Sequence, residues 1–133
     1  MKKLLITAYW IGIIADAIAT ILLFSPQIAN LLLQPQSFEI SAQYLYVTRI
    51  AGALMAGWTA LLLWARNKPI ERADILLITL FPVVTLMLTA AILAARTGQL
   101  SVGRLVPMFI LYILIFVTFI PSYLWARKQK ESS

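Results

Sequence analysis

The sequence predicts an all-α membrane protein, a four-transmembrane-helix bundle with both termini on the cytoplasmic side. Three observations predict it: the 133 residues are 62% hydrophobic and 12% charged, the mean hydropathy is +0.89, and the apolar residues fall into four long runs. A soluble globular domain is far more polar than this. We expect residues 1–133 to form a single integral membrane domain, because the chain has room for only one.

The four apolar runs have the length of helices that cross a membrane. They cover about residues 4–24, 43–65, 73–95 and 104–126, and each is near the roughly 20 residues that cross a bilayer core of about 30 Å. A backbone in lipid must satisfy its own hydrogen bonds, and no run alternates like a barrel strand, so helices are predicted. The first run is longer than the apolar part of a cleavable signal peptide, which favours a span there.

Shorter signals mark the connections and one span interior. Ser25 followed by Pro26 is typical of a helix start, and the apolar residues that follow predict a short interfacial helix over about residues 26–33. Pro82 lies inside the third span, where a proline frees a backbone carbonyl and permits a kink. Gly98 follows the same span and suits its C-terminal cap.

The basic residues are distributed unevenly between the two sides of the predicted bundle. Eight fall on the side of the termini and two on the other, and loops rich in Lys and Arg remain in the cytoplasm. We therefore expect one fixed orientation in the cell (inner or plasma) membrane, with cytoplasmic N- and C-termini, and no dual-topology dimer. The eight are Lys2, Lys3, Arg66, Lys68, Arg72, Arg127, Lys128 and Lys130, and the two are Arg96 and Arg104.

Two charged residues lie inside the predicted spans, Asp16 in the first and Arg49 in the second. Each costs about 2.5–3.5 kcal/mol at the centre of a membrane, so neither should face lipid. Counted from the outer ends of their spans they lie about 12 Å and about 8 Å deep, which predicts an ion pair between them. Two interpretations stay open: a functional site for a polar solute, an ion, a proton or a lipid headgroup, or a structural bridge that fixes the register of two helices.

Small residues at helical spacing predict that the first two spans pack together around these charges. The candidate pocket walls are Trp10, Gly12 and Thr20 in the first span and Gly52 and Trp58 in the second. A packing role is the alternative for both tryptophans. The small face of the second span continues from Gly52 through Ala53, Ala56, Gly57 and Ala60.

Other classes of function find little support in the residues. The chain has no Cys and no His, which removes thiol and imidazole catalysis and the metal sites built from these groups; we expect neither an enzyme nor a cofactor. The net charge of +6 comes without the basic and aromatic stripe of a nucleic-acid-binding surface. The expected partners are the lipid bilayer and other membrane subunits, or further copies of the chain in a homo-oligomer.

A distinctive pattern spans the end of the second span and the start of the third. Residues 57–72 read GWTALLLWARNKPIER, and residues 73–79 read ADILLIT. The pattern resembles that of small uncharacterised prokaryotic four-helix membrane proteins, and the likeness extends over most of the chain, including Asp16 and Arg49. The resemblance implies a helical membrane protein and brings no known activity. The residues themselves predict small-solute or ion transport, or membrane ligand binding, around the Asp–Arg pair, with a structural or accessory subunit of a larger membrane complex as the alternative.

Overall fold

Helices account for all the regular secondary structure in the part of the chain that the structure describes. This computed structural model describes residues 1–33 and 40–133. Four helical stretches within these ranges are long and apolar enough to cross a membrane, so the predicted all-helical architecture with four candidate spans is confirmed. The stretches are Lys2–Phe24, Ala42–Arg66, Asp74–Arg96 and Val102–Glu131.

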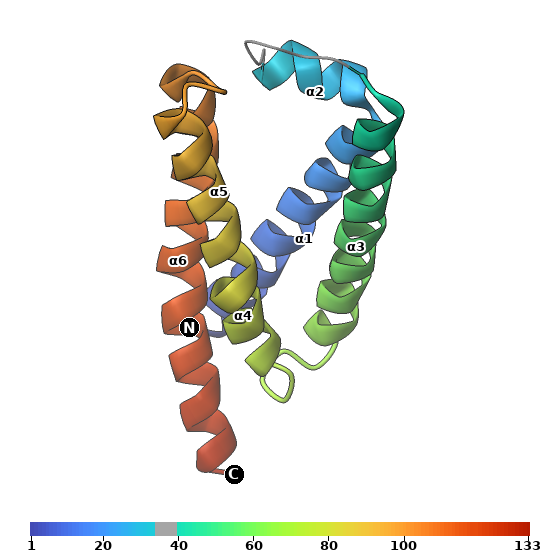
Figure 1. Cartoon of the computed structure of the whole chain (residues 1–133). Coiled ribbons are helices and arrows are strands. Elements are labelled where there is room, and N and C mark those ends of the chain that lie inside the picture. Colours follow the sequence, from blue (N-terminus) through green and yellow to red (C-terminus); the bar gives the residue numbers. More distant parts are fainter. Residues whose placement is uncertain (34–39) are drawn as a thin grey trace.

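The third span is built from three consecutive elements, whereas the other spans are single helices (Figure 1). The last helix continues beyond the predicted residue 126 to Glu131, and an i,i+4 ion pair of 2.9 Å between Arg127 Nε and Glu131 Oε1 lies in its final turn. The elements are α1 (Lys2–Phe24), α2 (Pro26–Leu33), α3 (Ala42–Arg66), α4 (Asp74–Ile78), the π-helical η1 (Thr79–Val84), α5 (Thr85–Arg96) and α6 (Val102–Glu131).

The third span is kinked at Pro82, as the position of this proline predicts. Phe81 has an extended backbone (φ −126°, ψ 108°), because the ring of the following proline disfavours a helical conformation there. Thr85 Oγ1 donates a hydrogen bond of 2.8 Å to the Leu80 carbonyl, which satisfies a backbone acceptor inside the apolar span. The span ends at Arg96, and Gly98 follows it two residues later with a φ of +72°, the left-handed conformation that glycine adopts readily.

The buried core extends along α5 and α6, but on α1 and α3 its side chains are confined to one end of the molecule. Both termini and the turn of residues 67–73 lie at this end, named the terminal end, while α2 and the turn between α5 and α6 lie at the other, named the α2 end (Figure 1). α1 packs most extensively against α3 and next against α6. The buried side chains of α1 and α3 belong to the halves nearest the terminal end, where α6 packs against them: Leu5, Tyr9, Ile13, Leu62, Ala65, Phe119 and Ala126.

The helix pairs separate toward the α2 end. In Figure 1, α1 and α3 diverge from α5 and α6 beyond the core. On this stretch of α1 the side chains of Ile14, Ile18, Ile21 and Phe24 are exposed. An apolar surface of this extent suits contact with lipid tails better than contact with water.

Gly12 lies where α1, α3 and α6 meet. A Cβ atom at this position would lie 3.0 Å from Phe119 Cζ and 3.1 Å from Leu62 Cδ1. The missing side chain therefore permits the close approach of three helices. Gly52 is placed in the same way against Phe24, whose Cε2 would lie 2.8 Å from a Cβ atom there.

The other small residues of α3 lie outside this contact. A Cβ atom on Gly57 would meet nothing within 4 Å, because the core-facing side of α3 is the one that carries Leu62 and Ala65. Apart from Gly52, the expectation that the small face of α3 packs on the first span is wrong. The exposed small residues are Ala53, Ala56, Gly57 and Ala60.

Candidate functional site

Asp16 continues the core-facing side of α1 at the point where the core ends. It follows the buried Gly12 and Ile13 by one turn and is itself half-buried. Its Oδ2 atom is shielded from solvent and has no hydrogen-bond partner. Thr20 Oγ1 donates a hydrogen bond of 2.8 Å to the backbone carbonyl of Asp16 and not to its carboxylate. A buried carboxylate oxygen is thus left unsatisfied, which costs free energy unless a proton or a ligand supplies the partner.

The predicted ion pair between Asp16 and Arg49 is absent from the structure. Arg49 is exposed on α3, and the described part of the chain has no hydrogen bond or ion pair that joins the two side chains. Asp16 is therefore not neutralised by this arginine. The ion pairs among the described residues are Lys68–Glu71 (3.0 Å), Arg127–Glu131 (2.9 Å) and Lys130–Asp74 (3.2 Å).

The register of α1 against α3 explains why the pair does not form. Gly52 lies against the ring of Phe24, the last residue of α1, so Arg49 lies near the end of α1. Asp16 precedes Phe24 by about two turns, which separates the two charges by roughly 10–15 Å along the helix axes. Side chains also tilt toward the N-terminus of their own helix, so on these antiparallel helices the two charged side chains point away from each other.

Three of the predicted pocket walls lie at the depth of Asp16 or within a turn of it. Gly12 precedes Asp16 by one turn and Thr20 follows it by one turn. Since Gly12 lies against Leu62, Trp58, one turn before Leu62 on α3, comes level with Asp16. Its Nε1 atom donates a hydrogen bond of 3.1 Å to Thr79 Oγ1 in η1, so this tryptophan also ties α3 to the kinked span.

The other two predicted walls, Trp10 and Gly52, serve different contacts. Gly52 accommodates the ring of Phe24, about two turns from Asp16. Trp10 is 41% exposed, and its ring lies under a guanidinium group, with Arg66 Cζ at 4.6 Å from the ring centroid. The structure therefore does not bring these two residues to the carboxylate.

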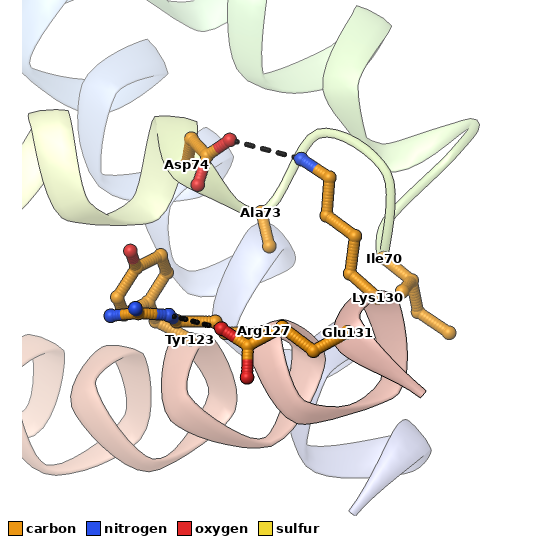
Figure 2. Close-up of a pocket in the computed structure, with 7 residues that line it drawn as sticks. All are labelled: Ile70, Ala73, Asp74, Tyr123, Arg127, Lys130 and Glu131. Carbon is orange, nitrogen blue, oxygen red and sulfur yellow. Dashed lines mark hydrogen bonds and ion pairs between the residues drawn. The ribbon is translucent and has the colours of Figure 1, made fainter. Parts of the chain in front are cut away.

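A shallow pocket of about 190 Å³ lies at the terminal end, between α6 and the start of α4. Figure 2 shows Lys130 reaching from α6 to Asp74, with 3.2 Å between Nζ and Oδ2. Arg127 is paired with Glu131 in the same pocket. The charged side chains that line the pocket therefore already compensate one another, and an added ion would be bound only weakly. The lining residues are Ile70, Ala73, Asp74, Tyr123, Arg127, Lys130 and Glu131.

Tyr9 is an important residue that sequence reasoning missed. Its side chain is fully buried, and its hydroxyl group lies 3.2 Å from the Pro69 carbonyl and 3.1 Å from the Arg72 carbonyl, to which it donates. It thereby fixes the turn of residues 67–73 to α1. No signal in the sequence distinguishes it from an interfacial tyrosine.

The chemistry available at Asp16 is that of a single carboxylate. It can bind a cation, accept a hydrogen bond or take up a proton. Residues 1–33 and 40–133 contain no group of three or more His, Cys, Asp or Glu side chains that could hold a metal ion. No protein-family model, curated protein or solved structure matches the chain.

Proposed function

We propose that the protein is a multi-pass integral membrane protein of the cell membrane that binds a small cation, or a solute carrying a positive charge, at Asp16. The observation that carries the proposal is the buried Oδ2 atom without a partner on the core-facing side of α1. A carboxylate inside the membrane is costly, and a purely structural role would require a partner that offsets this cost. A bound cation supplies the compensating charge.

The proposed orientation has both termini in the cytoplasm. The two termini and the turn of residues 67–73 share one end of the molecule (Figure 1), so the eight basic residues of the N-terminus, this turn and the C-terminus gather there. Arg96 and Arg104 flank the turn between α5 and α6 at the opposite end. This bias supports a cytoplasmic terminal end.

Reporter fusions test the orientation. We expect a reporter that is active only in the cytoplasm to be active at the C-terminus and after Lys68, and inactive after Gln99, because the positive loops are retained inside. Alkaline phosphatase, which is active only outside the cytoplasm, should give the inverse pattern at the same three positions. An active phosphatase at the C-terminus would overturn the proposed topology.

Asp16→Asn and Arg49→Gln, made singly and together, separate a ligand site from a structural bridge. We expect Asp16→Asn to leave the free energy of unfolding unchanged or raise it by up to about 1 kcal/mol, since the amide avoids a buried unpaired charge. Arg49→Gln should change it by less than about 0.5 kcal/mol, and the double variant should be additive within about 0.5 kcal/mol. Unfolding is followed by circular dichroism in mixed micelles. A coupling energy above about 1 kcal/mol between the two substitutions would favour the structural-bridge interpretation over a ligand site.

Cation binding is measured on the same proteins by thermal unfolding. Sodium chloride and tetraphenylphosphonium chloride serve as a small and a lipophilic probe cation, with sorbitol as the osmotic control. We expect at least one cation to stabilise the wild type and Arg49→Gln, and to bind Asp16→Asn about tenfold or more weakly, because a charge-assisted contact is lost. Equal stabilisation of Asp16→Asn by both cations would contradict a site at Asp16.

The exposed small face of α3 favours a second candidate, a subunit that packs against another membrane helix. Small residues at this spacing let helix backbones approach closely. Because the chain has no Cys, Ala56→Cys gives a unique cross-linking position, with Ile110→Cys on α6, 61% exposed, as the control. A product of twice the chain mass specific to position 56 indicates a homo-oligomer, and a product of another mass indicates a different subunit. No specific product at position 56 would rule this candidate out.

A further inference from the structure

Arg66 ends α3 at the terminal end and lies on the ring of Trp10 from α1. The Cζ atom is 4.6 Å from the ring centroid, a distance at which the cation is attracted by the face of the indole. The Nε atom is shielded from solvent and has no hydrogen-bond partner. Arg66 is half-buried and Trp10 is 41% exposed, so the stacked pair is held in place but remains accessible from outside.

The carboxylates of the terminal end are paired with other cations. None of the ion pairs in the described part of the chain includes Arg66, so its positive charge is left without an anion. Arg66 is also the last residue of a candidate span, and the ends of membrane spans lie near the phospholipid headgroups. The pairs that engage these carboxylates are Lys68–Glu71, Lys130–Asp74 and Arg127–Glu131.

An exposed apolar stripe leads from this arginine along α1 toward the α2 end. Trp10, Ile14, Ile18 and Ile21 follow one another at helical spacing, and their exposed fractions are 41%, 54%, 52% and 59%. The stripe is about 16 Å long, from eleven residue steps at helical rise. This length can accommodate a large part of one acyl chain, whereas a free phosphate ion would make no contact with the stripe.

We propose that Arg66 and Trp10 bind the phosphate group of an anionic phospholipid, with one acyl chain along the stripe that starts at Trp10. The planar guanidinium group provides several donors in the geometry that phosphate oxygens accept, and the indole ring suits the border between headgroups and tails. The site rests on the proposed membrane location and does not depend on Asp16. Basic positions at the ends of spans on the cytoplasmic side are where anionic headgroups bind.

Native mass spectrometry of the full chain, titrated with dioleoyl phosphatidylglycerol, tests this site. We expect Arg66→Gln to weaken binding about tenfold, which corresponds to a lost charge-assisted contact of about 1.4 kcal/mol. The control Lys128→Gln removes one exposed charge from the same end and should stay within about twofold of the wild type. Phosphatidylcholine should bind the wild type at least about tenfold more weakly than phosphatidylglycerol.

Several results would overturn the lipid site. Equal losses in Arg66→Gln and Lys128→Gln would indicate unspecific attraction of anionic lipid. Displacement of the lipid by equimolar glycerol 3-phosphate would identify a free-phosphate site. If Arg66→Gln does not fold, Arg66→Lys is the replacement variant. It keeps the positive charge but loses the planar guanidinium group. An unchanged affinity of Arg66→Lys for phosphatidylglycerol would reject the guanidinium contact. If the reporter fusions show the proposed topology and any of these binding results is obtained, only the lipid site is rejected. The proposed membrane location then stands, because the protein is inserted as expected.

Discussion

Replacing Tyr9 by alanine is expected to lower the free energy of unfolding by about 3–5 kcal/mol, because a large buried aromatic side chain leaves a cavity. The side chain has no exposed surface and packs in the core at the terminal end. Its loss also removes the hydroxyl donor to the Pro69 and Arg72 carbonyls. Reversible unfolding in mixed micelles, followed by circular dichroism, gives the difference.

Two variants separate the ring of Tyr9 from its hydroxyl group. Tyr9→Phe removes only the donor and should cost about 1–2 kcal/mol, because two part-buried carbonyl groups lose a hydrogen-bond partner. Tyr46→Ala is the control, since this tyrosine is 67% exposed and its loss should change stability by less than about 0.5 kcal/mol. A Tyr9→Phe variant as stable as the wild type would show that the turn of residues 67–73 does not depend on this hydroxyl group.

Replacing Gly12 by leucine is expected to lower the free energy of unfolding by about 2–3 kcal/mol, because added side-chain atoms overpack a close helix contact. Phe119 and Leu62 already lie 3.0 and 3.1 Å from the place of a Cβ atom, and Leu adds three more carbon atoms beyond it. α1 would have to move away from both neighbours. The same unfolding measurement in mixed micelles gives the difference.

Gly57→Leu is the matched control for the substitution at Gly12. It makes the same chemical change on α3, where a Cβ atom would meet nothing within 4 Å. We expect it to be neutral or to stabilise the protein by up to about 1 kcal/mol, because leucine has a higher helix propensity than glycine. Equal destabilisation at both positions would mean that the contact around Gly12 is not tighter than the exposed face of α3.

The sequence was sufficient to predict four long apolar helices and insufficient to predict their register. The four apolar runs and Pro82 predict long helices and a kink because both depend on local composition and backbone chemistry. The level at which α3 passes α1 depends on how Phe24 fits against Gly52, which is a tertiary contact. Counting depth from the two helix ends therefore placed Arg49 too close to Asp16.

Contacts between residues far apart in the chain likewise could not be predicted from the sequence. Tyr9 and Arg72 are 63 positions apart, and Arg66 meets Trp10 only because α1 and α3 pack side by side. Hydropathy identifies all four residues as belonging to span ends or spans, but it does not tell which helix faces another. The importance of Asp16 could be predicted, because a carboxylate in an apolar run is conspicuous; its missing partner could not.

The location of the buried residues on α1 implies that the two halves of this helix differ in their local opening. Amide hydrogens of α1 near Leu5 and Tyr9 lie in the densely packed half and should exchange with deuterium slowly, whereas those near Ile18 and Ile21 should exchange faster wherever water reaches them. Asp16 lies at the boundary between these halves. A ligand bound at Asp16 would slow amide exchange in the next turns of α1. Binding would therefore be detected at amides that do not contact the ligand.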